Sequence, residues 1–206
     1  YGRVHLMERI EDTGVFELFI PGLAAGCGYM YEIKRQGKGT TRKLDPVSRQ
    51  ISSVPITASV VSDENMPDSY AWNDGLWMIK RKKEAGKKKP VTVYEVSLTD
   101  WLKEKSADEL VDFVKQEGYT HVCFLPVAEY LNEEMNGYST LGYFAVTHRI
   151  GGSNAFKKLV DDCHNAGIGV IIDWNGAYFG TEAKGLYDFD GADAYGYLKP
   201  SLEKHP

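Results

Sequence analysis

An acidic residue and an aromatic residue directly follow an apolar run near the carboxyl end of the sequence. The run is residues 170–172, and Asp173 and Trp174 come immediately after it. Such a change from apolar to polar residues is typical of a parallel strand that leaves a buried interior at its carboxyl end. Because polar groups at the carboxyl ends of parallel strands usually meet ligand, Asp173 and Trp174 are candidate site residues.

Strand and helix patterns alternate from residue 91 onwards and predict how these residues are held. We expect strands at 91–98, 120–127 and 169–173. Ser106 and Glu109 form a capping-box pattern that begins one helix, and Gly118 ends it. A second helix is expected from about Ser153 to Gly167, after a long loop. Strands joined by helices predict parallel β/α units.

The first 63 residues favour antiparallel strands instead. Alternating residues at 15–20 and 29–33 are followed by turn signals, which predicts a small antiparallel β unit. Residues 64–90 are interpreted as a solvated linker, because their basic run is not interleaved with aromatic residues. We expect Trp72 and Trp77 in this linker to pack between domains.

The bulk composition excludes several classes of function. The 206 residues are 43% apolar and carry a net charge of -5 with a pI near 5.6. This charge gives no electrostatic basis for binding nucleic acid. The sequence has no apolar run of about 18 residues and no signal-peptide pattern, so we expect no membrane partner and a cytoplasmic location.

The cysteines and histidines show no arrangement that would bind a metal or a cofactor. Cys27, Cys123 and Cys163 lie in or beside apolar runs without metal-type spacing, so buried thiols in a reducing compartment are expected. His121 and His164 lie in strand and helix contexts, where packing or capping is the expected role. We therefore predict no metal site and no cofactor.

Short motifs occur in a fixed order along nearly the whole chain. Around Asp173 they are Cys163-His164-Asn165-Ala166-Gly167, Gly185-Leu186 and Phe189-Asp190-Gly191. Upstream they are Tyr94-Glu95-Val96 with Trp101, Phe124-Leu125-Pro126 with Glu129, Gly137-Tyr138, and Gly142-Tyr143-Phe144-Ala145. This ordered set resembles the amylase-type glycoside hydrolases of family 13, and among these the α-glucan branching enzymes. Residues 2–7 and 16–22 resemble the carbohydrate-binding module of family 48.

This resemblance implies a fold and a reaction. The fold is an immunoglobulin-like β sandwich at 1–63, apparently without its first strands, a linker at 64–90, and parallel β/α units of a partial TIM-type barrel at 91–206. Less than half of the about 250 residues of a closed barrel follow Pro90, so three of the eight strands are expected. The implied reaction cleaves an α-1,4 link of a glycogen-like glucan and re-attaches the chain through an α-1,6 link.

The resemblance also implies roles for particular residues. The catalytic carboxylates are expected beyond Pro206, so no catalytic residue is assigned in this chain. Tyr138 matches a tyrosine that stacks under the sugar, although an ordinary loop tyrosine is the alternative. Asp173 matches an aspartate that positions the neighbouring groups of the site. Trp174 is expected to support this aspartate. Glu129 matches a loop glutamate of branching enzymes, with a solvated carboxylate as the alternative. Tyr178 stands where the family has a sugar-binding histidine.

Three functions remain open from the sequence. The first is part of an active branching enzyme. The second is a catalytically impaired relative that binds glucan or acts as a scaffold, because Tyr178 removes an imidazole that would stabilise charge in the transition state. The third is an α-glucan hydrolase of the same family. The 206-residue chain alone is predicted to be inactive in each case, because the carboxylate pair of glycoside chemistry is not expected within it.

Overall fold

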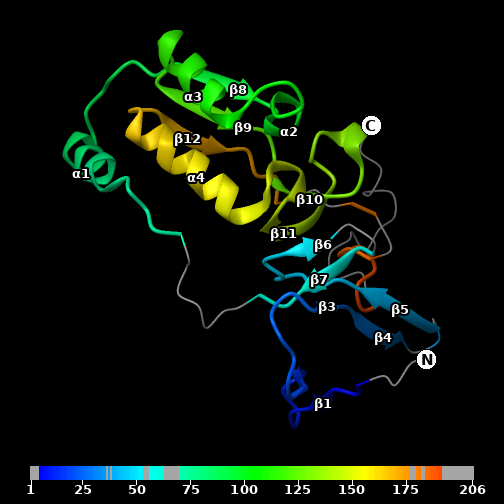
Figure 1. Ribbon diagram of the computed structural model, residues 1–206. Coiled ribbons are helices and arrows are strands. Elements are labelled where there is room, and N and C mark those ends of the chain that lie inside the picture. Colours follow the sequence, from blue (N-terminus) through cyan, green and yellow to red (C-terminus); the bar gives the residue numbers. More distant parts are fainter. Residues whose placement is uncertain are drawn as a thin grey trace.

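A computed structural model describes residues 5–35, 37, 39–52, 56–62, 70–176, 180–181 and 184–191. It contains several antiparallel sheets and one parallel sheet with helices (Figure 1). The antiparallel strands of the first 60 residues lie at one end of the molecule, and the parallel sheet lies at the other. A hairpin from the middle of the chain lies between them and carries part of the candidate site.

The first half forms short antiparallel strands, as predicted. The pairs are β1 (Glu8–Arg9) with β2 (Phe16–Glu17), β3 (Gly28–Tyr29) and β6 (Ile51–Ser52) with β7 (Ala58–Val60), and β4 (Tyr31–Arg35) with β5 (Gly39–Lys43). The predicted bounds are wrong. Only two residues of 15–20 form a strand, and 29–33 is divided between two sheets. Phe19 is 86% exposed, and no described residue buries it. The alternating apolar pattern around Phe19 therefore does not extend the strand.

Residues 64–90, interpreted as a solvated linker, contain the helix α1 (Gly75–Glu84). The segment before α1 is bound to α4 (Gly152–Asn165) by Asp161, which is 3% exposed. Asp161 accepts hydrogen bonds from the Tyr70 hydroxyl at 2.9 Å and from the Asn73 amide N–H at 3.0 Å. The Trp77 ring stacks on His164 of α4 with 4.9 Å between the ring centres, and Trp72 contacts Tyr70. Packing of these tryptophans between domains stays a prediction. The basic residues that follow are exposed.

The parallel sheet contains β8 (Val93–Val96), β9 (His121–Phe124) and β12 (Gly169–Ile172), in the order β12-β9-β8. The prediction of three parallel strands is confirmed. The first of them ends earlier than predicted, because the Ser97 hydroxyl accepts a hydrogen bond from the Asp100 N–H and begins the short helix α2 (Leu98–Trp101). A side chain that caps a helix competes with continuation of the strand.

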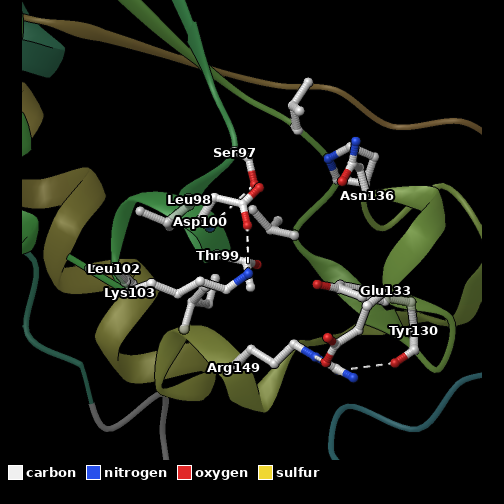
Figure 2. A pocket seen from close by; sticks show the side chains of 14 residues that line it. Ser97, Leu98, Thr99, Asp100, Leu102, Lys103, Tyr130, Glu133, Asn136 and Arg149 are labelled. Carbon is white, nitrogen blue, oxygen red and sulfur yellow. Dashed lines mark hydrogen bonds and ion pairs between the residues drawn. The ribbon is translucent and has the colours of Figure 1, made fainter. Parts of the chain in front are cut away.

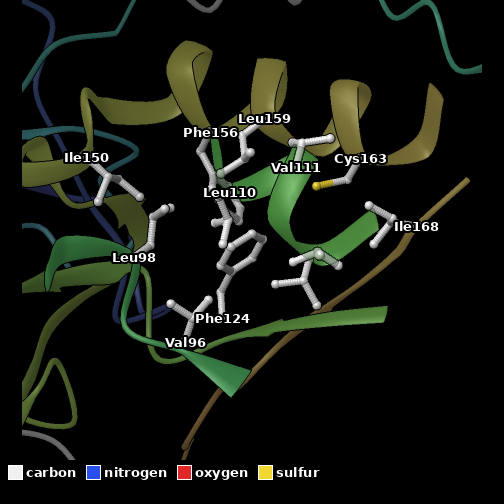
Figure 3. Packing of buried hydrophobic residues seen from close by; sticks show 12 residues of the cluster. Val96, Leu98, Leu110, Val111, Phe124, Ile150, Phe156, Leu159, Cys163 and Ile168 are labelled. Atoms are coloured by element: carbon white, nitrogen blue, oxygen red, sulfur yellow. The ribbon is translucent and has the colours of Figure 1, made fainter. Parts of the chain in front are cut away.

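The helices α3 (Ala107–Gln116) and α4 pack side by side on one face of this sheet. The capping box is confirmed: Glu109 donates its backbone N–H to the Ser106 hydroxyl, and its carboxylate accepts the Ser106 N–H at 2.7 Å. Buried side chains from both helices meet those of the strands (Figure 3). Phe124 of β9 lies at the centre with Leu110 and Phe156, and it is fully buried. This core holds the carboxyl ends of the strands in place.

The expected long loop before α4 is a β hairpin instead. It consists of β10 (Ala128–Tyr130), η1 (Glu133–Met135), β11 (Thr140–Val146) and η2 (His148–Ile150). A second small core joins the hairpin to the antiparallel strands through Leu44, Ile51, Leu141 and Ala145. A Cβ atom at Gly142 would lie 2.3 Å from the end of the Ile51 side chain, so a larger residue there would require that side chain to shift. The hairpin therefore has a fixed position relative to both sheets.

The histidines pack as expected, whereas the cysteines do so only in part. The His121 ring occupies the space that a Cβ at Gly169 would fill, and His164 lies between Trp77 and Asp74. Cys163 is 1% exposed, but Cys27 is exposed, so the prediction of a buried thiol is wrong there. Cys27 lies next to a turn at the edge of β3, where no described side chain covers it.

Candidate functional site

Tyr138 and Asp173 meet, although 35 residues separate them in the sequence. The Tyr138 hydroxyl donates a short hydrogen bond to the Asp173 carboxylate. Asp173 follows β12 directly, and its backbone N–H donates to the Phe124 carbonyl at 2.9 Å. The pair therefore lies at the carboxyl edge of the parallel sheet, where ligands of β/α proteins usually bind.

The hairpin holds Tyr138 in this position through its backbone. Gly137 has a φ of 86°, and a Cβ atom there would lie 2.8 Å from the Pro126 carbonyl oxygen. The Tyr138 N–H donates to the Met135 carbonyl at 2.8 Å, which closes the turn after η1. Only glycine fits both the left-handed conformation and the close approach to the end of β9. The Gly137-Tyr138 dipeptide is thus required for the tyrosine to reach Asp173.

Acidic groups on the same face of the sheet surround the Tyr138 hydroxyl. Glu95 of β8 and Cys123 of β9 are cross-strand partners, and Cys123 pairs in turn with Ile171, two residues before Asp173. The pKa of Tyr138 is raised from 10.0 to about 12, first by the hydrogen bond to Asp173 and then by burial. The charges of Asp173 and Glu95 raise it further. Tyr138 therefore stays protonated and acts as a donor to Asp173 near neutral pH.

Trp174 lies on the other side of Asp173, in the wall of a small cavity. The cavity has a volume of about 150 Å³ and is lined by Pro126, Val127, Ala128, Thr140, Tyr143, Phe144, Ala145, Val146, Ile172, Asp173, Trp174 and Asn175. The Trp174 ring is 61% exposed and contacts Tyr143 edge-on at 5.6 Å. Exposed aromatic rings around a carboxylate can bind the apolar face of a sugar while the carboxylate accepts its hydroxyl protons.

Glu129 is a buried carboxylate at the base of the hairpin, not a solvated one. It lies in β10 and is 2% exposed. Its partners are the N–H of Tyr130 at 3.1 Å, the hydroxyl of Thr147 at 3.1 Å, the N–H of His148 at 3.0 Å and its ring nitrogen at 2.9 Å, and the guanidinium of Arg149 at 2.9 Å. The two ends of the hairpin are joined through this one side chain.

Sequence reasoning found Glu129 but missed its partner Arg149. Arg149 also donates to the Tyr130 carbonyl at 3.0 Å, and its guanidinium lies 4.3 Å from the centre of the Tyr130 ring. Because the hairpin was not predicted, nothing in the sequence indicated that Arg149 lies beside Glu129, which is 20 residues earlier. Tyr143 and Phe144 were matched to the family but received no role, although both line the cavity beside Asp173.

Tyr178 lies outside the described residues. Among the described residues, no cluster of three or more histidine, cysteine or acidic side chains could hold a metal ion. In the same part of the chain, no helix has the length and apolar character needed to span a bilayer.

The Tyr138–Asp173 bond makes stability depend on pH in the alkaline range. The folded-state pKa of Tyr138, about 12, lies above the ordinary value of 10.0, so the bond stabilises fully below pH 10 and is lost as pH rises to about 12. The free energy of unfolding should therefore fall between pH 10 and about 12, and we expect a smaller fall in Asp173→Asn. Urea denaturation at several pH values measures this difference. Equal slopes in the two proteins would contradict the role of this bond.

Comparisons with known proteins show which proteins the chain resembles. No family model matches the chain. It is 41% identical over 214 residues to a 1,4-alpha-glucan branching enzyme GlgB of Methylococcus capsulatus, and 40% identical over 214 residues to one of Nitrosococcus oceani. Each match covers 99% of this chain and 28% of the relative. The chain thus spans less than a third of the length of these relatives.

A solved structure is similar as well. A crystal structure described as an alpha amylase from Salmonella typhimurium superposes with a TM-score of 0.64 at 25% sequence identity. The similarity covers 86% of this chain and 29% of that protein. The similar fold therefore extends over most of the chain.

Proposed function

This chain resembles the amino-terminal part of 1,4-alpha-glucan branching enzymes over 99% of its length, and from this premise we propose that it belongs to a protein with that activity. The protein would cleave an α-1,4 link of an α-glucan, hold the released chain covalently and re-attach it through an α-1,6 link. The observation that carries the proposal is the Tyr138–Asp173 pair at the carboxyl edge of the parallel sheet. Both residues belong to segments that match the family.

The residues of this chain would supply the sugar-contact side of the site. Tyr138 is the residue on which the sugar would stack. The hairpin holds its backbone and Asp173 holds its hydroxyl, so the position of its ring is fixed. Trp174 forms the wall beyond Asp173, and Glu129 keeps the hairpin in position from below. Tyr178 is assigned to the same pocket by its place in the motif alone. The pair of carboxylates that double displacement requires, about 5 Å apart, is assigned to the rest of the protein.

The architecture proposed for the chain follows the same family. Residues 1–63 are assigned to an immunoglobulin-like module, 64–90 to a connecting segment and 91–206 to the first three units of a TIM-type barrel. The antiparallel pairing in the first segment and the parallel order β12-β9-β8 in the third support this division. The three cysteines are unpaired, which suits the reducing environment of the cytoplasm.

An assay of the full-length protein on amylose tests the proposal. We expect the iodine stain to decrease without a matching rise in reducing ends, because transfer re-forms one bond for each bond cleaved. The 206-residue chain alone is expected to leave both readouts at the level of the buffer blank. A proportional rise in reducing ends would identify a hydrolase instead, and two unchanged readouts with the full-length protein would leave a binding or scaffold role.

A further inference from the structure

A second and larger cavity lies beside α2 and is separate from the Tyr138–Asp173 pair. Its volume is about 260 Å³, and Figure 2 shows side chains of α2, η1 and Arg149 around it. We call it the α2 pocket and define it by Ser97, Asp100, Lys103, Glu133, Asn136 and Arg149. Ser97 follows β8 directly, so this pocket also opens at the carboxyl edge of the parallel sheet. The segment 126–127 lines both cavities, which makes them neighbours.

The charged groups of the α2 pocket are balanced. Lys103 pairs with Asp100 at 2.7 Å, and Arg149 pairs with Glu133 at 3.3 Å (Figure 2). The side chains that line the pocket, two positive and two negative, carry no net charge, and the buried Glu129 carboxylate behind them also pairs with Arg149 at 2.9 Å, so nothing there would select an anion. Each carboxylate still has free lone pairs, and each cation has free N–H groups. A neutral ligand with many hydroxyl groups can use donors and acceptors of both kinds at once.

Arg149, a hydrogen-bond donor on one side of the pocket, is held in place in the absence of a ligand. The Arg149 guanidinium is bound by the buried Glu129 carboxylate at 2.9 Å and by the Tyr130 carbonyl at 3.0 Å. Its side chain is only 17% exposed. Since its rotamers are already restricted, a ligand that hydrogen-bonds to it loses little additional entropy. Asn136 adds an amide for which no partner occurs among the described residues, and it points toward the cavity in Figure 2.

The rest of the wall is apolar and suits the carbon face of a sugar. Leu98, Leu102, Pro126 and Ile150 line the cavity together with the charged groups. Binding sites for small molecules combine such apolar walls with a few polar groups in fixed positions. The volume lies just below the range of about 300–1,000 Å³ that is usual for drug-sized ligands, so one sugar unit fits better than a buried oligosaccharide.

We propose that the α2 pocket is a second glucan-binding site, which holds one glucosyl unit of an α-glucan chain at a point apart from the Tyr138–Asp173 pair. This proposal rests on the proposed function for its ligand class. The two sites share the carboxyl edge of one sheet, so a chain or two neighbouring chains can contact both.

Calorimetric titration of the full-length protein with maltoheptaose tests this proposal. We expect at least two classes of site in the unmodified protein. The double variant Lys103→Ala/Glu133→Ala removes one cation and one carboxylate, keeps the net charge, and should weaken one class at least tenfold. Asn136→Gly should weaken the same class, and glycine tolerates the left-handed backbone found at Asn136. Tyr138→Ala should weaken the other class.

A double variant of an exposed ion pair elsewhere serves as the matched control. Glu84→Ala/Lys89→Ala removes a pair at 2.7 Å between the last residue of α1 and the segment after it, and this variant should bind like the unmodified protein. If both α2-pocket variants, with circular dichroism spectra unchanged, bind maltoheptaose like the unmodified protein, the proposal is wrong. A single class that Tyr138→Ala abolishes, in a protein that still branches amylose, overturns the second site alone. Loss of both maltoheptaose binding and branching in the unmodified protein would overturn the proposed function.

Discussion

Glu129→Ala will lower the free energy of unfolding by about 3–5 kcal/mol, the cost usual for removing one partner of a buried ion pair. The substitution leaves the Arg149 guanidinium without its buried carboxylate. It also leaves the N–H groups of Tyr130 and His148 and the hydroxyl of Thr147 without their acceptor. Each buried donor without a partner adds its own desolvation cost. Urea denaturation of the full-length protein, followed by a signal from this region, measures the change.

Glu133→Ala is the matched control for this experiment. Glu133 pairs with the same Arg149, but its side chain is 73% exposed, against 2% for Glu129. We expect a change below about 0.5 kcal/mol, because exposed ion pairs contribute little. Equal effects of the two substitutions would mean that burial does not determine the contribution of Glu129. A change below about 1 kcal/mol at Glu129 would contradict its role in holding the hairpin.

Tyr138→Ala in the full-length protein will reduce kcat/KM for branching by about 10- to 100-fold, which corresponds to about 1.4–2.7 kcal/mol of lost transition-state binding. The alanine variant removes the ring on which the sugar is proposed to stack. Tyr138→Phe keeps the ring and removes only the hydrogen bond to Asp173, so a smaller loss is expected. Initial rates over a range of amylose concentrations measure both variants.

Glu134→Ala is the control in the same hairpin. Glu134 is an exposed residue of η1, and its substitution should leave kcat/KM unchanged. If Tyr138→Phe loses as much activity as Tyr138→Ala, the hydroxyl and not the ring carries the effect, and the stacking role is wrong. Full activity of Tyr138→Ala would place the sugar elsewhere.

Local signals determined much of the second half of the molecule. The capping box at Ser106 and Glu109 begins α3 as predicted, because its bonds join residues only three positions apart. The apolar runs of β9 and β12 likewise predicted strands, because continuous apolar runs of this length are typical of parallel strands, although Ile171 and Ile172 of β12 are 40% and 45% exposed. Asp173 was identified as a site residue from its place after such a run.

Contacts between distant segments were decided only by the tertiary structure. The apolar pattern of β10 and β11 is short and did not predict that the two strands pair as a hairpin. The ion pair between Glu129 and Arg149, 20 residues later, joins the two ends of this hairpin. In the same way, α1 became an ordered helix because Asp161 binds the segment ahead of it, 88 residues away from Asn73. The sequence alone thus determined the strand-end position of Asp173 and, through family resemblance, the candidate role of Tyr138. The hydrogen bond between them exists because Gly137 lets the folded hairpin approach the end of β9, an approach that no local pattern encodes.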